Sequence, residues 1–351
     1  MKAVVLAGGK GSRLRPFTYS GAKQLLPIGN TPVLFFALRQ IAEAGITDIA
    51  IVVGDTAELV MAAAGDGSAF GARFTYLRQP APLGIAHALG LARDFAAGEP
   101  VLLYLGDNML RGGIRDFVDR FRASDAAGAV IVRRVPNPTA FGVAVFEDGR
   151  LVRVVEKPAE PPTDFAVVGI YAFRPIVFDV VAAQRPSARG ELEIADTING
   201  LLERGCRIDV TLTEAEWVDT GKMEDTLAAN RIVLEDLVPS VSSEATLEAC
   251  RLTGVVVVEA GAVIERSELI GPVAVAAGAR IRDSRVGPYV SVGPGASISR
   301  SEVTNAIIME RASIERCAGL TASMIGREAK VTGLPAGASV TLGDHSAVEL
   351  P

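Results

Sequence analysis

KAVVLAGGKGSRL, residues 2–14, begins the chain with an apolar run that ends in glycines. The apolar run 2–7 predicts a buried strand, and the glycines predict a tight turn after it. Alternating signals follow: helical spacing at 31–44 and 85–95, and strand-like runs at 48–53, 73–77 and 101–105. This alternation predicts an α/β fold with a Rossmann-like, mostly parallel sheet covered by helices on both faces. Because ligands bind such sheets beyond the carboxyl ends of the strands, residues directly after strands are the candidate site residues.

After about residue 236 the sequence changes character, and Tyr289 is the only aromatic residue after Trp217. Aliphatic residues recur there at steps of six, with some steps of five: Val257, Val263, Leu269, Val275, Ile281, Val286, Val292, Ile298, Val303, Ile308, Ile314 and Leu320. Small residues follow several of them four positions later: Gly261, Ser267, Ala279 and Ala296. This period predicts a left-handed parallel β-helix of hexapeptide repeats. We therefore expect two domains, 1–236 and 237–351, with a helix at 223–236 before the boundary.

Composition excludes several classes of protein. The 351 residues are 49% hydrophobic and carry a net charge of −6, so neither a disordered chain nor a general nucleic-acid binder is expected. No apolar run approaches the roughly 18 residues of a membrane span, although the mean hydropathy is +0.32. The three cysteines, Cys206, Cys250 and Cys317, have no metal-binding spacing and are interpreted as buried thiols of a cytoplasmic protein.

The glycine-rich turn carries the first functional signal. Its glycines let backbone N–H groups approach phosphate oxygens closely. Three cations lie within or after the glycines and could bind the same phosphate oxygens: Lys10, Arg13 and, after a short gap, Lys23. The turn is neither a Walker A loop nor a dinucleotide fingerprint, because Leu14 stands where a third glycine would be. A glycine-rich turn with merely exposed basic residues is the alternative.

Residues 8–16 (GGKGSRLRP) and 23–27 (KQLLP) resemble the signature of the sugar-1-phosphate nucleotidyltransferases, most closely the glucose-1-phosphate thymidylyltransferases. A β-helix tail is similar to the long form of that family, which is associated with deoxysugar biosynthesis. The resemblance implies Mg²⁺-dependent transfer of dTMP from dTTP to α-D-glucose 1-phosphate, with dTDP-glucose and pyrophosphate as products. A phosphate oxygen is already ionised at neutral pH, so no general base is expected.

The resemblance also implies residue roles. Arg13 would hold the leaving pyrophosphate, Lys23 would stabilise the transition state, and Asp107 and Asp219 would hold Mg²⁺, which prefers carboxylate oxygens. The implied nucleotide-binding residues are Leu6, Gly8, Gly9, Gly11, Ser12, Arg13, Gln24, Gln79, Gly84 and Asp107. The implied sugar-phosphate-binding residues are Asn108, Gly142, Glu156, Lys157 and Val167.

Structural roles are the alternatives for several of these residues. Asp107 could cap a helix, Asp219 could be a turn residue, and Val167 by itself predicts a core position. Glu156 and Lys157 by themselves could be a solvated charge pair in a turn.

The sequence departs from the family pattern at two positions. Thr31-Pro32 stands where many members have Lys-Pro, so no lysine role is expected there. Lys222 stands where short forms often have Thr, and it either adds a cation near the metal site or begins the next helix. His87 is interpreted as a packed or edge residue, and His345 lies beyond the periodic segment.

Three other functions remain open at this point. The first is the same chemistry with UTP, because uracil and thymine differ by one methyl group. The others are a hexapeptide-type acyltransferase and a non-catalytic scaffold. The β-helix also predicts a homo-oligomer; no nucleic-acid or membrane partner is expected.

Overall fold

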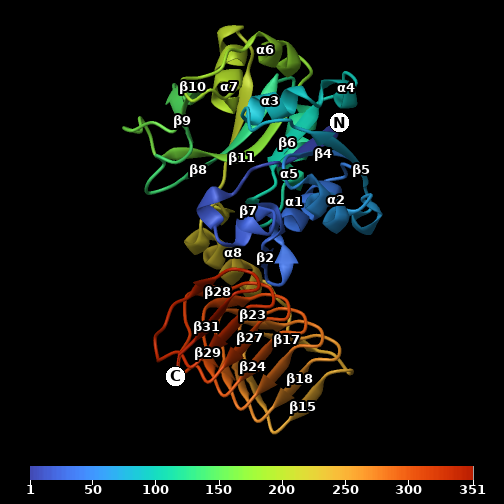
Figure 1. Cartoon of the computed structure of the whole chain (residues 1–351). Helices are drawn as coiled ribbons and strands as arrows, with labels where there is room; N and C mark the ends of the chain where they lie inside the picture. The colour runs from blue at the N-terminus through green and yellow to red at the C-terminus, as the bar shows by residue number, and fades with distance from the viewer. Residues whose placement is uncertain (351) are drawn as a thin grey trace. The chain divides into compact units, whose positions relative to one another are not determined.

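The computed structural model describes residues 1–350, and its backbone contacts group the chain into two compact units (Figure 1). The sheet unit comprises Met1–Lys10 and Leu34–Trp217, and the β-helix unit comprises Gly11–Val33 and 218–350. Residues 11–33, which we call the signature loop, therefore belong by their contacts to the β-helix unit. Division of the chain at residue 236 stays a prediction.

The sheet unit contains a nine-stranded mixed sheet. One half is parallel, in the order β6 (Val101–Leu105), β1 (Lys2–Ala7), β4 (Asp48–Val53) and β5 (Arg73–Arg78). The other half consists of β10 (Arg150–Glu156), β9 (Gly142–Glu147), β11 (Phe165–Phe173), β8 (Gly128–Arg134) and β12 (Ile208–Leu212). Strand β11 is antiparallel to β6, β8 and β9, and β12 is parallel to β8. The predicted α/β class is confirmed, and the antiparallel half is an addition to the expected parallel sheet.

Helices cover both faces of this sheet. Helices α3 (Ile85–Gly90), α6 (Val177–Ala183) and α7 (Ile194–Glu203) pack together on one face. On the other face lies α1 (Val33–Glu43), where Gln40 Oε1 accepts a hydrogen bond from the buried Tyr104 hydroxyl at 3.0 Å. The remaining helices of this unit are α2 (Ala57–Ala64), α4 (Arg93–Ala96) and α5 (Arg115–Ala123), and the short strand β7 is Asn108–Leu110. The helix expected at 85–95 is thus divided into α3 and α4.

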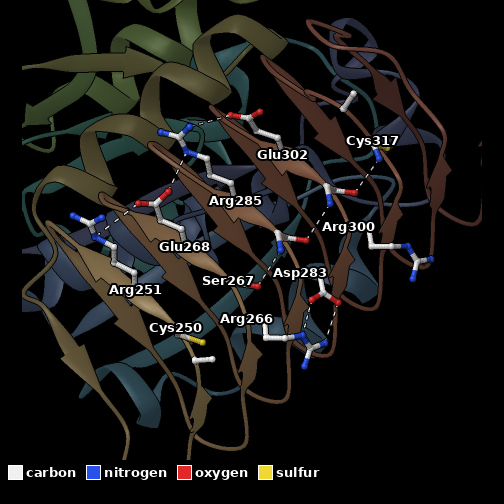
Figure 2. A pocket seen from close by; sticks show the side chains of 14 residues that line it. Cys250, Arg251, Arg266, Ser267, Glu268, Asp283, Arg285, Arg300, Glu302 and Cys317 are labelled. Atoms are coloured by element: carbon white, nitrogen blue, oxygen red, sulfur yellow. Dashed lines mark hydrogen bonds and ion pairs between the residues drawn. The ribbon is translucent and has the colours of Figure 1, made fainter.

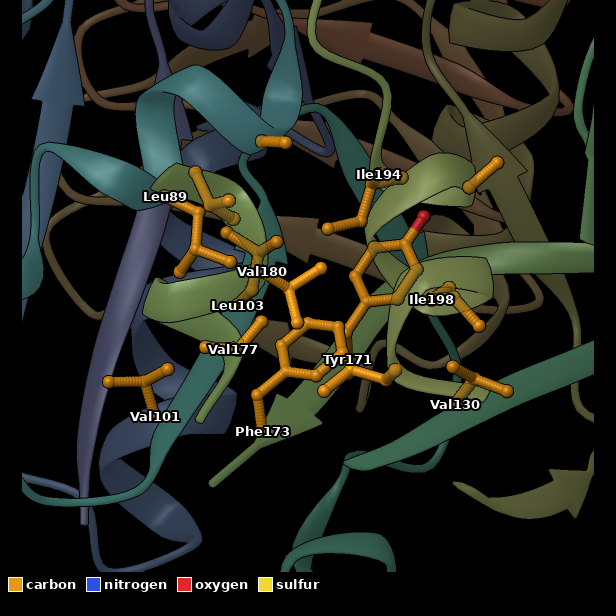
Figure 3. Packing of buried hydrophobic residues seen from close by; sticks show 14 of the residues in the cluster. Leu89, Val101, Leu103, Val130, Tyr171, Phe173, Val177, Val180, Ile194 and Ile198 are labelled. Atoms are coloured by element: carbon orange, nitrogen blue, oxygen red, sulfur yellow. The ribbon is translucent and has the colours of Figure 1, made fainter. Parts of the chain in front are cut away.

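The core between β11 and the helices of the first face contains two stacked aromatic rings (Figure 3). The rings of Tyr171 and Phe173 lie 6.1 Å apart with an interplanar angle of 11°. Alternate residues of a strand share a face, which brings both rings against the aliphatic side chains of α6 and α7. This packing holds β11 in place beside β9 and β8.

The β-helix unit has three parallel sheets. Their orders are β14-β17-β20-β23-β26-β28-β30, β15-β18-β21-β24-β27-β29-β31 and β16-β19-β22-β25. Val256 pairs with Val273, which pairs with Val290, so one coil takes 17 residues in this stretch, as two steps of six and one of five require. The bounds are β14 Ser240–Val241, β15 Thr246–Glu248, β16 Arg251–Thr253, β17 Val256–Val258, β18 Val263–Glu265, β19 Glu268–Ile270, β20 Val273–Val275, β21 Arg280–Arg282, β22 Arg285–Val286, β23 Val290–Val292, β24 Ser297–Ser299, β25 Glu302–Val303, β26 Ala306–Ile308, β27 Ser313–Glu315, β28 Ser323–Ile325, β29 Lys330–Thr332, β30 Thr341–Leu342 and β31 Ala347–Glu349.

The first two positions of the predicted aliphatic series are wrong by one residue. Val258 and Ile264 are buried in the coil, whereas Val257 and Val263 are only half-buried. Neighbouring aliphatic residues flank both positions, so the period could not show which one faces inward. From Leu269 to Leu320 the members of the series are buried as predicted.

Residues 11–33 pack on α8 (Met223–Glu235) and on outward-facing side chains of the coils. The apolar cluster comprises Leu14, Phe17, Leu26, Leu227, Ile307, Met309 and Met324. The segment contains the 3₁₀ turns η1 (Ser12–Leu14), η2 (Phe17–Tyr19) and η3 (Lys23–Leu25) and the hairpin of β2 (Pro27–Ile28) and β3 (Thr31–Pro32). The short strand β13 is Trp217–Asp219, and the last 3₁₀ turn, η4, is Ser68–Phe70 in the sheet unit.

Two further observations concern exposure. Among residues 1–350, no helix is long and apolar enough to span a membrane. All three cysteines are free, but only Cys317 is buried, so the expectation of three buried thiols is wrong for Cys206 and Cys250. Cys250 lies in the first coil, where no earlier coil covers it.

Candidate active site

The parallel half of the sheet brings predicted residues to one edge. Gly8 follows β1, Gln79 follows β5 and Asp107 follows β6, all at carboxyl ends of parallel strands. A methyl group built on Gly8 would lie 3.2 Å from the backbone nitrogen of Gly54 and 3.6 Å from Gln79 Oε1. Gly8 is therefore needed for a close approach of the turns after β1 and β4.

Gln79 and Gly84 lie together, as the predicted base contacts require. Gln79 Nε2 donates to the Gly84 carbonyl oxygen at 3.2 Å and lies 3.0 Å from Nδ1 of His87. Gly84 has φ +102°, and a methyl group there would lie 2.4 Å from the Leu192 carbonyl oxygen. Only glycine fits this turn. Leu6 is half-buried at the end of β1, and Gly9 is half-buried just after it.

The strand end after β6 holds Asp107 and Asn108 in a buried setting. Asp107 is 8% exposed, and Asn108 Nδ2 donates to its Oδ1 at 3.1 Å. The amide orientation of Asn108 is fixed because Trp217 Nε1 donates to Asn108 Oδ1 at 2.6 Å. The Trp217 ring packs 4.8 Å from that of Phe141, the residue before Gly142.

The antiparallel half of the sheet brings the predicted sugar contacts together. A methyl group on Gly142 would lie 3.5 Å from Glu156 Oε2 and 3.8 Å from Val167 Cγ2. Lys157 lies beside them with its Nζ 3.5 Å from Glu156 Oε1. Lys157 has φ +42°, in the left-handed region that costs free energy for a lysine.

Two residues that the sequence analysis missed complete this cluster. Arg189 Nη2 lies 3.3 Å from Glu156 Oε1 and 2.8 Å from Glu193 Oε1, so one guanidinium bridges two carboxylates. Burial raises the pKa of the Glu156 carboxyl and Glu193 adds to that rise, while Lys157 and Arg189 oppose it. Arg189 and Glu193 are the first and last residues of RGELE, 189–193, which lies just before α7. In the sequence, only the charges of this segment could have indicated them.

In the β-helix unit, the signature loop holds the predicted phosphate contacts. Gly11 has φ +61°, and a methyl group there would lie 2.8 Å from Cβ of Lys23. Ser12 and Arg13 are exposed in η1, whereas Gln24 is 1% exposed. Its buried Oε1 has no hydrogen-bond partner among residues 1–350.

Arg13 also lies near the second predicted metal ligand. A methyl group on Gly221 would lie 2.8 Å from Arg13 Nη2 and 3.3 Å from Asp219 Oδ1. Lys222 is the N-cap residue of α8, which supports the helix interpretation of this lysine. Burial raises the pKa of the Asp225 carboxyl in the first turn of α8, which Lys222 and Arg13 oppose.

The signature loop is anchored to the coils by polar contacts as well. Asn30 Nδ2 donates to the Val292 carbonyl oxygen at 3.1 Å, and Gly29 N donates to Asn230 Oδ1 at 2.8 Å. Ser20 Oγ donates to Asp344 Oδ2 at 2.8 Å. These contacts bind residues 20–30 to three separated parts of the β-helix unit.

A shallow groove of about 630 Å³ lies over the coils and holds none of the predicted site residues (Figure 2). Its arginines are paired with acids, as in Arg266 Nε to Asp283 Oδ1 at 2.7 Å and Arg285 Nε to Glu268 Oε2 at 3.5 Å. A serine ladder, Ser267, Ser284 and Ser301, is hydrogen-bonded from coil to coil. Four arginines and three acids line the groove, and the fourth arginine, Arg300, pairs with Glu315 outside the lining.

His345 lies in the last described coil, between β30 and β31, so the β-helix extends beyond the predicted periodic segment. Its Nδ1 is 3.2 Å from Glu328 Oε2, and the side chain is exposed. Among residues 1–350 there is no cluster of three or more His, Cys, Asp or Glu side chains suited to a metal ion.

Comparisons with known proteins agree with this geometry. Residues 2–236 match the family model described as nucleotidyl transferase. The chain is 44% identical over 354 residues to a glucose-1-phosphate thymidylyltransferase from Streptomyces griseus, covering 100% of this chain and 99% of the relative. It is 46% identical over 254 residues, 71% of each chain, to a low-salt glycan biosynthesis nucleotidyltransferase from Haloferax volcanii.

A solved structure assigned as a glucose-1-phosphate thymidylyltransferase from Bacillus anthracis, in complex with sucrose, is similar with a TM-score of 0.64 and 37% identity. The match covers 68% of this chain and 97% of that one. The glycine turn, the strand-end residues and these matches together lead to one conclusion: the chain belongs to the nucleotidyl transferase family.

Proposed function

We propose that this protein is a glucose-1-phosphate thymidylyltransferase of the long form, which transfers dTMP from dTTP to α-D-glucose 1-phosphate and releases pyrophosphate. The observation that carries the proposal is the 44% identity, over the whole chain, to relatives of that name from two Streptomyces species. The product, dTDP-glucose, would feed deoxysugar biosynthesis. We also propose the catalytic domain as 1–236 and the β-helix domain as 237–351.

The sheet unit would bind the base and the sugar. The Gln79–Gly84 turn offers polar groups to a pyrimidine edge, and Gly8 and Gly9 leave room for a nucleotide near the backbone. The Glu156 carboxylate accepts hydrogen bonds from sugar hydroxyls, and Lys157 meets the sugar phosphate. Gly142, Asn108 and the backbone near Val167 complete the sugar side.

The signature loop would bind the triphosphate. Gly11 and Ser12 present backbone groups, Arg13 holds the pyrophosphate as it leaves, and Lys23 stabilises charge that develops at the α-phosphoryl group. An oxygen of the sugar phosphate forms the new bond to the α-phosphorus, while the bond from that phosphorus to the pyrophosphate oxygen breaks. The attacking oxygen is already ionised, so no side chain needs to remove a proton.

Mg²⁺ is the proposed cofactor. The candidate ligands Asp107 and Asp219 offer only carboxylate oxygen, which suits this hard cation, and Mg²⁺ commonly takes one or two protein carboxylates beside substrate phosphates. When bound, the ion would supply positive charge to the triphosphate. The location of Asp107 after the end of β6 and its hydrogen bond from Asn108 support this role.

The test is pyrophosphate release with Mg²⁺, measured for dTTP, UTP, dCTP and ATP against several sugar 1-phosphates. We expect the highest kcat/KM for dTTP with glucose 1-phosphate. A clear preference for UTP would make the protein a uridylyltransferase, and no release with any pair would refute the proposal. Acetyl-CoA with a sugar nucleotide serves as a control for acyl transfer, and we expect no free CoA.

Self-association and location complete the proposal. We propose a homo-oligomer, because the first coil exposes apolar side chains such as Val241 and Leu247 at 46% and 40%. Light scattering would test it. The substrates and three free thiols favour the cytoplasm.

A further inference from the structure

The side-chain amide of Gln79 is fixed in one orientation by its neighbours. Its nitrogen Nε2 lies 3.2 Å from the Gly84 carbonyl oxygen and 3.0 Å from Nδ1 of His87. A backbone carbonyl oxygen can only accept a hydrogen bond, so the amide nitrogen, and not the amide oxygen, must face Gly84.

This orientation also determines the state of His87. The amide nitrogen of Gln79 only donates, so Nδ1 of His87 must accept. The imidazole is then neutral and carries its hydrogen on Nε2, because an imidazolium ion has no acceptor. Gly84 is the N-cap residue of α3, and His87 lies three residues later in that short helix.

Both amide hydrogens of Gln79 are used by these two contacts, which leaves its oxygen for another partner. This oxygen faces the α-carbon of Gly8, where a methyl group would lie 3.6 Å from it. Gln79 is thus presented as a hydrogen-bond acceptor beside the glycine turn.

We propose that His87 is a positioning residue that keeps Gln79 an acceptor and thereby selects nucleotides whose pyrimidine carries an N3–H. Thymine and uracil donate from N3, whereas N3 of cytosine is an acceptor and would repel Oε1. Without an acceptor at position 87, the amide loses one of the two contacts that fix it and can rotate. The inference rests on the proposed function, because it uses Gln79 as the base contact.

The experiment compares three variants of the full-length protein in reactions that contain dTTP and dCTP together with glucose 1-phosphate and Mg²⁺. His87→Leu removes the acceptor, and His87→Asn keeps an acceptor oxygen near the position of Nδ1. His345→Leu is the matched control, because it changes the chain's other histidine, which contacts Glu328. Product ratios give the ratio of the two kcat/KM values.

We expect His87→Leu to lower the dTTP:dCTP ratio by about 3- to 10-fold, the effect of losing one hydrogen bond that orients a half-buried amide. The loss should occur mainly in KM for dTTP, and His87→Asn should restore most of the ratio. His345→Leu should match the wild type. An unchanged ratio in an active His87→Leu variant would overturn the inference.

The outcomes separate this inference from the proposed function. If the wild type releases no pyrophosphate from any nucleotide, the proposed function is refuted. If the wild type is active and the dTTP:dCTP ratio is the same in the His87→Leu variant, only the role of His87 is refuted. Should His87→Leu not fold, as judged by circular dichroism, His87→Phe gives the same readout with a larger side chain that also lacks an acceptor.

Discussion

Phe17 offers a direct test of whether the coils hold the signature loop. Its side chain is 2% exposed in the cluster that joins residues 11–33 to α8 and to Ile307, Met309 and Met324. Truncation of a buried phenylalanine to alanine costs about 3–5 kcal/mol. We expect Phe17→Ala to concentrate this loss in the loop, because few other apolar side chains of the loop are buried against the coils.

The assay is amide hydrogen exchange followed by mass spectrometry, together with kcat. If the loss is local, exchange in 11–33 should accelerate by about 10²- to 4 × 10³-fold, and kcat should fall because Arg13 and Lys23 lie in this segment. Tyr19→Ala is the matched control in the same 3₁₀ turn: its ring is 73% exposed, and its contact with Arg15 is worth at most about 1 kcal/mol. Equal exchange in the two variants would refute the packing argument.

Four other outcomes are expected. Lys23→Ala and Asp107→Ala should each lower kcat by about 10²-fold or more, measured by pyrophosphate release, and near-wild-type turnover in both would contradict their roles. Burial raises the pKa of Glu156 above 4.5, so KM for glucose 1-phosphate should rise as pH falls through that raised value, and Glu156→Gln should remove the dependence. The same shift means that the stabilising contribution of this carboxyl is fully present below pH 4.5 and is lost as pH rises from 4.5 through the raised folded pKa, which thermal melts can follow. Gly84→Ala should cost more activity and stability than Gly190→Ala, since a methyl group meets Leu192 at 2.4 Å at the first position and no atom within 4 Å at the second; equal melting temperatures would count against this.

Much of the fold was predictable because its signals are local. The runs 2–7, 48–53 and 101–105 became strands with those bounds, since continuous apolar residues suit a strand buried on both faces. The helix at 223–236 and the coil period were also predictable. The inward residue was not predictable at Val257 and Val263, where adjacent aliphatic side chains compete for the same position.

The candidate site was predictable from the signature, but its neighbours were not. Gly8, Gln79 and Asp107 follow three strands, and the rule on carboxyl ends places them at one edge. Arg189 and Glu193 could not be found, because Arg189 contacts Glu156 across more than 30 positions with no spacing signal, and Glu193 joins the cluster only through Arg189.

The amino-acid order alone determined the family signature, the strands and the coil repeat, because each depends on residues close together along the chain. Only tertiary packing determined that residues 11–33 are bound to coils about 300 residues later, through Ser20 and Asp344. Packing also made His87 a hydrogen-bond partner of Gln79 and oriented the amide of Asn108 through Trp217. These features depend on which donors and acceptors meet in space, and a hydrogen bond acts only across about 3 Å, whatever the separation in sequence.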